Sequence, residues 1–381
     1  MKSIRLFTLL FFLLSACMVY SQTIPQTYCP ELVKLAKKGN AEAQLLLGEC
    51  YAFGDGVPLD YSEAVKWWRK AAGQGNAVAQ FNLGVCSENG KGVSQDISEA
   101  AKWYRKAAEQ GYVQAQYNLG VFYAKGHGVP QDYSEAVKWF RKSAEQGVAE
   151  AQSNLGVCYE KGWGVPEDMS EAVKWYRKAA EQGHASAQNN LGFCYAFGQG
   201  ISQDFTEAAK WWRKAAEQGV VEAQSQLGNC YYNGWGVSQD FSEAVKWYRK
   251  AAEQGNANAQ NNLACCYYDG TGVTQDYTEA VKWFRKLAEQ DGYDYIASSN
   301  LGECYYYGRG VPQDFDEAVR LWRHGADEGN HPWALEGMGR CYLNGRGVPK
   351  DYQKALEYYR RSAAQGYKPA IEALESLGEK P

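Results

Sequence analysis

The side chains with the most reactive chemistry in this sequence are its cysteines, and their spacing is regular. Eleven cysteines occur in 381 residues. Eight recur at one place of a repeated pattern: Cys50, Cys86, Cys158, Cys194, Cys230, Cys266, Cys304 and Cys341. A disulfide needs Cα atoms within about 7 Å, whereas packed helices of successive repeats lie about 10 Å apart. No CxxC or zinc-type spacing occurs, so neither a metal nor a cofactor is expected. The row predicts buried thiols acting as small apolar side chains, and Phe122 at the same place supports this.

A second row of polar side chains has two interpretations. Its members are Asn82, Asn118, Asn154, Asn190, Gln226, Asn262 and Asn300. A side-chain amide both donates and accepts hydrogen bonds, so the row could hold the backbone of an extended peptide. Alternatively, each amide bonds a helix end of the neighbouring repeat and only holds the stack.

Positions beside this row differ from repeat to repeat. Tyr117 and Phe193 occupy two of them, and Trp163 and Trp235 recur in loops two repeats apart. Variation on a constant scaffold is typical of a binding surface, although drift on a solvated face would look similar. Tryptophan is enriched at binding hot spots, so the loop pair is expected to add anchors.

Catalysis would need a constellation that departs from the repeat. Asp291, Asp294, His324 and His331 lie where the repeat is irregular, without a recognised spacing or an obvious nucleophile. The sequence therefore predicts no enzyme. The formal net charge of −4 also argues against a general nucleic-acid binder, which needs a clustered basic surface.

The elements that position these residues follow from a 36-residue repeat. Repeats begin at Ala41, Ala77, Val113, Ala149, Ala185, Val221, Ala257, Tyr295 and Pro332. In a typical repeat, apolar spacing predicts one helix over Ala149–Lys161. Gly162 and Gly164 interrupt it, Asp168 caps a second helix, and Gly183 ends that helix.

One such hairpin cannot cover both of its apolar faces, whereas stacked hairpins can. The predicted fold is all-α, a right-handed α-solenoid (superhelix) of about nine αα-hairpin repeats of 36 residues. Gly156 and Ala172 would let the two helices approach closely, with Tyr159 and Trp175 filling the gaps. Basic residues such as Lys174 are expected on a solvated outer face, paired with nearby acids such as Glu171.

The N-terminal residues resemble an export signal. Lys2 and Arg5 precede the apolar run LFTLLFFLL, which is too short to cross a bilayer. Residues 1–21 form a signal peptide in one interpretation; in the other, residues 1–16 form a lipoprotein signal and Cys17 is lipidated. Either leads to a periplasmic, outer-membrane-anchored or secreted protein. Residues 22–40 would follow as an N-terminal segment and capping helix, and residues 368–381 as a C-terminal capping segment.

Cys29 lies outside the regular row. Folding the capping helix back about Asn40 would bring Cys29 opposite Cys50. Because export favours disulfides, the sequence predicts a Cys29–Cys50 disulfide.

The pattern LG–Y–G-GV–D–EA–KWY-KAAEQG resembles the Sel-one-like repeat (SLR) family, a relative of the tetratricopeptide repeats, over Ala41–Tyr367. Ser87, Ala264, Leu321 and Tyr358 depart from it. The resemblance implies a scaffold that binds a protein or peptide, and the tetratricopeptide relatives use helix asparagines to do so. Exported bacterial members serve in envelope processes or host contact. Some secreted members carry a second cysteine in each repeat and bind penicillin, but this chain lacks that second cysteine.

Three functions follow as alternatives. The first is a non-enzymatic scaffold or adaptor that binds a peptide or protein on the concave face of the solenoid. The second is an envelope enzyme or β-lactam-binding protein, and the third is a structural envelope component without a defined ligand. No nucleic acid is expected as a partner, and a membrane only through a lipid anchor at Cys17.

Overall fold

The fold is known from a computed structural model that describes residues 24–290 and 294–380. All regular secondary structure in these residues is helical. The predicted signal and Cys17 lie outside the described residues. The chain divides into two compact units, an N-terminal unit (Met1–His184) and a C-terminal unit (Ala185–Pro381), which are treated separately below. None of the described helices is long and apolar enough to cross a membrane.

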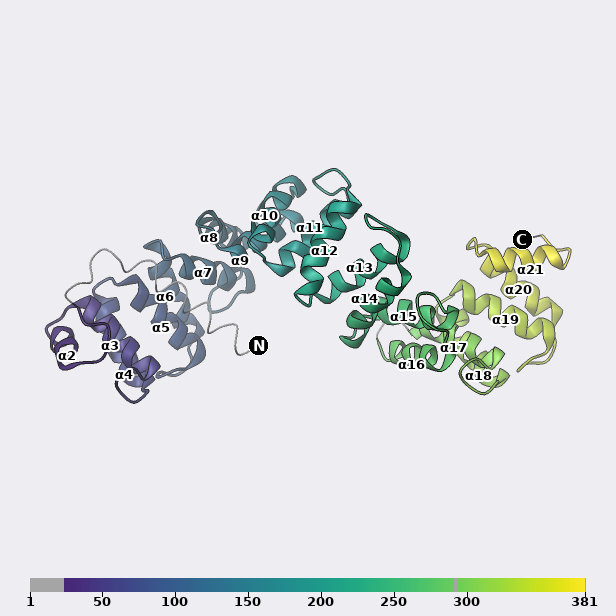
Figure 1. The fold of residues 1–381 in the computed structure, drawn as a ribbon, viewed down its shortest axis with the longest axis horizontal. Helices are drawn as coiled ribbons and strands as arrows, with labels where there is room; N and C mark the ends of the chain where they lie inside the picture. Colours follow the sequence, from purple (N-terminus) through teal and green to yellow (C-terminus); the bar gives the residue numbers. More distant parts are fainter. Residues whose placement is uncertain (1–23, 291–293, 381) are drawn as a thin grey trace. The chain divides into compact units, whose positions relative to one another are not determined.

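Each repeat forms two consecutive helices. The first helices are α3 (Ala41–Phe53), α5 (Ala77–Asn89), α7 (Val113–Lys125), α9 (Ala149–Lys161), α11 (Ala185–Phe197), α13 (Val221–Asn233), α15 (Ala257–Asp269), α17 (Asp294–Tyr307) and α19 (Pro332–Asn344). The second helices are α4 (Tyr61–Gly73), α6 (Ile97–Glu109), α8 (Tyr133–Glu145), α10 (Met169–Glu181), α12 (Phe205–Glu217), α14 (Phe241–Glu253), α16 (Tyr277–Ala288), α18 (Phe315–Arg323) and α20 (Tyr352–Ala363). Along each unit, every helix packs against the helices before and after it (Figure 1). The result is an all-α solenoid of repeated hairpins.

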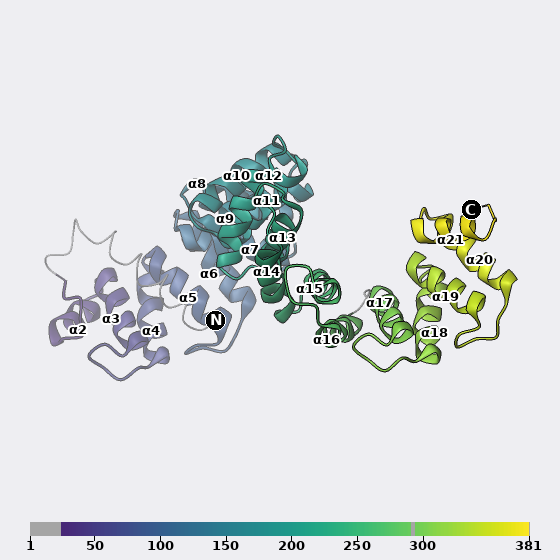
Figure 2. The same cartoon turned by 45° about the vertical axis from the view of Figure 1, so that its right-hand side comes forward.

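Two further helices flank the repeats. Helix α2 (Pro30–Lys37) packs against α3 and buries Leu32 and Ala36. Helix α21 (Lys368–Ser376) packs against α20 and buries Ala370 and Leu374; Figure 2 shows it beside α20 at the end of the chain. The first and last hairpins therefore each have a cover for an apolar face.

The local signals in the sequence explain the helix ends. The Asp168 carboxylate accepts a hydrogen bond from the backbone N–H of Glu171 at 3.0 Å, as an N-cap does. Gly183, directly after the C-cap, has φ +89°, a left-handed value that glycine adopts without strain. The predicted bounds of the first helix in this repeat, Ala149–Lys161, are confirmed.

The two helices of a hairpin meet at a glycine and an aromatic ring. A Cβ added at Gly156 would lie 2.6 Å from the ring of Tyr176. Gly156 was expected to permit this approach, but the ring over it belongs to Tyr176 and not to Tyr159 or Trp175. Tyr176 is fully buried, so the glycine and this ring form the centre of the hairpin.

The extra residue before the last repeat has a local explanation. After α18 the chain forms a π-helix, η1 (His324–Glu328), whose wider turn absorbs one additional residue. Asn330 then adopts φ +47°, the one positive φ outside glycine among the described residues. The repeat resumes at α19, with Ala334 and Leu335 fully buried.

Candidate functional site

A row of glutamines, which the sequence analysis did not single out, joins successive repeats. Gln116 of α7 donates from Nε2 to the carbonyl of Ala108 at the end of α6, 3.2 Å away. Its Oε1 accepts a hydrogen bond from Gln146 Nε2 at the end of α8, at 2.8 Å. Equivalent amide pairs are Gln44–Gln74, Gln80–Gln110, Gln152–Gln182, Gln188–Gln218, Gln224–Gln254 and Gln260–Gln290. The first member of each pair is buried, so these amides hold the stack together.

The predicted asparagine row lies two residues further along the same helices and is mostly half-buried. Burial, followed by the hydrogen bond to Glu88, raises the pKa of Tyr104, whereas a hydrogen bond from Asn118 acts in the opposite direction. Asn154 interacts with Tyr117 in the same way. These amides therefore contact a tyrosine of the preceding repeat and not a helix end.

Two further members of the row bond amides of the preceding repeat. Asn262 Nδ2 donates to Asn229 Oδ1 at 3.2 Å, and Asn300 Nδ2 donates to Asn261 Oδ1 at 3.2 Å. Asn300 is buried, whereas Asn82 and Asn190 are half-buried. Part of the hydrogen-bonding capacity of the row is thus used within the stack.

The variable positions beside the row carry half-buried aromatic rings. Tyr117 lies 6.2 Å from Phe140, and Phe193 lies 5.3 Å from Trp212, measured between ring centroids. Phe193 also stacks on Phe197, which is 64% exposed. These rings rest on the core and still present an edge to solvent.

The loop tryptophans contact the preceding repeat. Trp163 stacks on Tyr133 at 5.1 Å, and Trp235 stacks on Phe205 at 5.7 Å; both partners begin a second helix. Trp163 remains 43% exposed and Trp235 46% exposed. Each ring therefore packs against the preceding repeat with one face and is accessible to solvent on the other.

The basic residues of the second helices have local partners. Lys138 pairs with Glu135 at 2.6 Å, and Lys142 lies 4.2 Å above the ring of Trp139. Between them, Arg141 donates to the Tyr159 hydroxyl of the next repeat at 2.5 Å. Equivalent Lys–Glu pairs occur at Lys66, Lys102, Lys174, Lys210, Lys246 and Lys282. The side chains of this face are charged and solvated, and most of the basic ones have partners close by.

The cysteines are free thiols throughout the part of the chain that the structure describes. The predicted Cys29–Cys50 disulfide is therefore not formed in the structure. The Cys29 sulfur instead lies at the N-cap of α2, where it accepts a hydrogen bond from the backbone N–H of Leu32 at 3.5 Å. The cysteines of the regular row are buried, and burial raises the pKa of Cys158 to about 11.

The irregular region brings a serine and a histidine together. His331 Nδ1 lies 3.1 Å from Ser299 Oγ, which donates to the carbonyl of Tyr295 at 2.8 Å. The Ser299 hydroxyl has one proton, so it donates either to the Tyr295 carbonyl or to His331 Nδ1, depending on the tautomer of His331. Asp291 lies outside the described residues. The pair connects α17 to the N-cap of α19.

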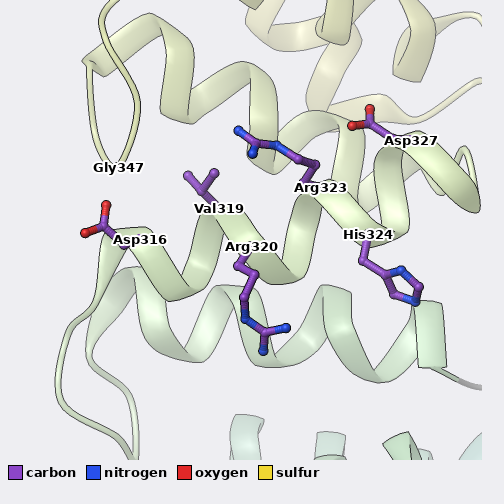
Figure 3. Close-up of a pocket in the computed structure, with 7 residues that line it drawn as sticks. All are labelled: Asp316, Val319, Arg320, Arg323, His324, Asp327 and Gly347. Carbon is purple, nitrogen blue, oxygen red and sulfur yellow. The ribbon is translucent and has the colours of Figure 1, made fainter.

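An open depression of about 530 Å³ lies beside this region (Figure 3). Its lining residues are Asp316, Val319, Arg320, Arg323, His324, Asp327 and Gly347. Arg320 and His324 leave the helix on the opposite side from Val319, so the polar groups do not converge (Figure 3). Arg320 is also held by Glu317, with Nε 2.7 Å from Oε2. Among the described residues, no group of three or more His, Cys, Asp or Glu side chains could hold a metal ion.

Hairpins stacked through buried amides and ring contacts define a helical-repeat scaffold. The family model of the Sel1 repeat matches residues 41–76, 77–112, 113–148, 149–184, 185–220, 221–256, 257–292, 296–330 and 334–367. The chain therefore belongs to the Sel1 repeat family. The last two matches begin one and two residues later than the repeats predicted at Tyr295 and Pro332.

Two solved structures are similar over most of the chain. The first is c5321, a protective antigen of uropathogenic Escherichia coli strains with an SLR fold. It shows 39% identity and a TM-score of 0.81, over 89% of this chain and 72% of that one. The second is a Sel1 repeat protein from Oxalobacter formigenes, with 34% identity and a TM-score of 0.57, over 82% of this chain and 89% of that one. No curated protein matches the chain. Sel1 repeats generally mediate protein–protein interactions, and the family is generally non-enzymatic.

Proposed function

We propose that this chain is a non-enzymatic scaffold that binds a protein or peptide partner on the solvent-facing side of its first helices. One observation carries the proposal. Positions that repeat along the chain, such as Gln116 and Gly156, are buried contacts of the stack. Positions that differ between repeats, such as Phe81, Tyr117 and Phe193, are half-buried rings with an accessible edge. Aromatic rings held on a rigid frame are typical anchors of protein interfaces.

The second helices are the less suitable surface for binding. Their lysines pair with glutamates or lie over tryptophan rings, and exposed charges of this kind contribute little free energy. Partner binding is therefore assigned to the first helices.

The test compares two surface variants in an affinity capture experiment followed by mass spectrometry. Phe193→Ser with Phe197→Ser alters the first-helix face, and Lys210→Gln with Lys246→Gln alters the second-helix face of the same unit. The proposal expects proteins captured by the wild type and the lysine variant to be lost from the phenylalanine variant. Because Phe193 packs on Trp212, circular dichroism checks that this variant is folded at the temperature of the capture. Equal capture by all three proteins would contradict it.

We also propose that the chain is exported. The support is the charged start and short apolar run of residues 1–21. Fractionation of expressing bacteria, with the intact mass of the mature protein, tests this. A mature chain that begins at Gln22 supports a cleaved signal peptide. One that begins at a lipid-modified Cys17 supports a lipoprotein, and that form is expected to disappear in Cys17→Ser. Full-length protein in the cytoplasm would contradict both.

A further inference from the structure

The last two repeats carry three arginines that alternate with two tyrosines. The ring of Tyr307 in α17 lies against two guanidiniums, with Arg309 Cζ 4.7 Å and Arg340 Cζ 5.5 Å from its centroid. The neighbouring ring, Tyr306, has Arg340 Cζ at 5.3 Å and Arg346 Cζ at 5.2 Å. The two ring centroids are 5.0 Å apart, so the five side chains form one continuous group, here called the arginine–tyrosine cluster.

The cluster lies on the first-helix side, to which partner binding is assigned above. Within its repeat, Arg340 of α19 occupies the place that Phe193 has in α11. Tyr307 occupies the place of Phe197 and is likewise exposed, at 43%. The variable positions of this side thus carry apolar rings at the start of the C-terminal unit and cations with tyrosines at its end.

Two of the arginines extend from loops at the place that Trp163 has in its own repeat. Arg309 directly follows the glycine after α17, and Arg346 directly follows the glycine after α19. Arg309 Cζ lies 5.5 Å from the ring centroid of Tyr277, and Arg346 Cζ lies 5.2 Å from that of Phe315. Both rings begin a second helix of the preceding repeat, so each loop guanidinium rests on a fixed surface.

Tyrosine hydroxyls hold each loop guanidinium through one nitrogen. Arg346 Nη1 donates to the Tyr306 hydroxyl at 3.0 Å, and Arg309 Nη1 donates to the hydroxyl of Tyr268. Among the described residues, no acceptor bonds the Nε or Nη2 of either arginine. Arg346 is exposed and Arg309 half-buried, so both keep N–H donors for a ligand.

The nearby acids leave this charge largely uncompensated. Glu336 is used by Arg340, which donates to it from Nε at 3.2 Å and from Nη2 to the other oxygen. Glu303 Oε1 lies 4.0 Å from Arg309 Nη1, at the outer limit of an ion pair. In the part of the chain that the structure describes, no carboxylate pairs with Arg346. The excess positive charge of the cluster therefore lies at its two loop arginines.

The cluster already contains an example of the contact that such an arginine makes. Arg340 lies beside both tyrosine rings and binds the Glu336 carboxylate through two nitrogens. This two-point geometry matches a planar guanidinium to a planar carboxylate. The surroundings of these rings thus accommodate a carboxylate bound to a guanidinium.

We propose that the arginine–tyrosine cluster binds an acidic segment of a protein partner, with aspartate or glutamate carboxylates on Arg309 and Arg346. The free guanidinium nitrogens would supply charge-assisted hydrogen bonds, and the exposed Tyr307 ring would pack against the segment between the acids. The inference rests on the proposed function, because it names the charge of the partner that the first-helix side of the C-terminal unit selects.

The test uses short labelled peptides as probes. Glu-Glu-Gly-Glu-Glu and Gln-Gln-Gly-Gln-Gln, each with the same rhodamine label, are titrated with the full chain, and fluorescence anisotropy is recorded. We expect saturable binding of the acidic peptide, at least tenfold weaker binding of the glutamine peptide, and weaker binding of the acidic peptide at high salt. Equal binding of the two peptides would overturn the inference.

A third probe separates carboxylates from phosphates. A labelled thymidine pentanucleotide carries four negative charges, as the acidic peptide does, but on phosphates. It is expected to bind more weakly than the acidic peptide. Equal or tighter binding of the nucleotide would show that the cluster does not select a protein segment and would also overturn the inference.

Variants locate the binding. Arg309→Gln with Arg346→Gln is expected to weaken the acidic peptide at least fivefold. The matched control, Lys210→Gln with Lys246→Gln, removes two positive charges from second helices of the same unit and should bind as the wild type does. Wild-type affinity in the arginine variant, or equal weakening in both variants, would contradict the inference.

A milder variant covers a loss of folding. Because Arg309 and Arg346 both contact the preceding repeat, circular dichroism checks that the double variant is folded at the temperature of the titration. Arg309→Lys with Arg346→Lys keeps both charges without the planar fork and is expected to retain more affinity than the glutamine variant. A lysine variant that is folded and binds the two peptides equally would count against the inference.

The two proposals fail separately. If the acidic and glutamine peptides bind equally while the Phe193/Phe197 variant still loses captured proteins, the scaffold function stands and the acidic preference is wrong. If neither the Phe193/Phe197 variant nor the Arg309/Arg346 variant loses a captured protein, the scaffold function itself is wrong.

Discussion

Gln110 at the end of α6 donates from Nε2 to Oε1 of Gln80, 2.7 Å away in α5 of the same repeat. Gln80 in turn donates to the carbonyl of Ala72 at the end of α4, at 3.2 Å. One buried amide thus joins three helices of two repeats. The Ala72 carbonyl also accepts from the backbone N–H of Gly75 at 3.0 Å, so the amide adds a second hydrogen bond to a buried helix-end acceptor.

Replacing one of these glutamines should lower stability. Gln116→Leu leaves the Ala108 carbonyl and the Gln146 amide without this partner, and we expect a loss of about 1–3 kcal/mol in the free energy of unfolding. Urea unfolding followed by circular dichroism measures it. Gln114→Leu changes an exposed residue of the same helix and should cost less than about 0.5 kcal/mol. Equal losses in the two variants would contradict the role of Gln116.

The loop glycines should respond differently to alanine depending on what lies beside them. Gly164 has φ +71°, and a Cβ there would come closer than 3.0 Å to the backbone of Tyr133 in the preceding repeat. Gly111 has φ +89° with no atom within 4 Å of an added Cβ. We expect Gly111→Ala to cost about 1–2 kcal/mol through backbone strain alone. Gly164→Ala should cost about 1–3 kcal/mol more because the backbone of Tyr133 must also shift. Similar losses of unfolding free energy for the two variants would show that the loop at Gly164 does not pack against the preceding helix.

Glu49 should make stability depend on pH. Its pKa is raised from 4.5 to about 7, first by burial and then by Glu42, so the folded chain holds this proton more tightly than the unfolded chain does. The stabilisation from protonated Glu49 is therefore complete below pH 4.5 and is lost as the pH rises to about 7.

Glu49→Gln removes this dependence. Relative to the wild type, the variant should gain at most about 3 kcal/mol between pH 4 and pH 8 in urea unfolding. Parallel stability curves for the two proteins would show that Glu49 titrates normally. Glu222→Gln, at an exposed site, is the matched control.

The cysteines should differ in reactivity. Burial raises the pKa of Cys158 to about 11, and that of Cys86 likewise to about 11, so few of these thiols ionise at pH 8. Cys29 is only partly buried. We expect iodoacetamide to modify Cys29 well before Cys86 and Cys158 in the native protein. Mass spectrometry of tryptic peptides gives the order, and modification in denaturant, where all should react, is the control. A Cys29 that stays unmodified in denaturant without reductant would show that it forms a disulfide.

Local signals explain how much of the fold the sequence predicts. The bounds of α9 and the capping role of Asp168 depend on residues within a few positions of each other, and both agree with the structure. The partner of Gly156 depends on how one helix is rotated against another. The apolar pattern therefore did not distinguish Tyr176 from its neighbour Trp175.

The candidate site was less predictable for a related reason. The glutamines at Gln116 and the asparagines at Asn118 recur almost equally along the sequence, yet only a tertiary structure shows which of them reaches a helix end. The rings of Phe81 and Tyr112, 5.0 Å apart, occupy positions that carry other residues in most repeats. A consensus of the repeats does not contain such residues.

The contact between each loop glycine and the helix before it gives the repeat array a direction. Gly92, Gly128 and Gly164 each rest on the start of the second helix in the preceding repeat. At the first repeat that neighbour is missing, and Gly56 rests on Tyr28 instead, with an added Cβ 2.9 Å from the Cβ of Tyr28. Loss of repeats from the C-terminal end leaves every remaining loop supported, whereas loss from the N-terminal end exposes a loop that no longer has a surface beneath it. The array can therefore be shortened or extended more readily at its C-terminal end.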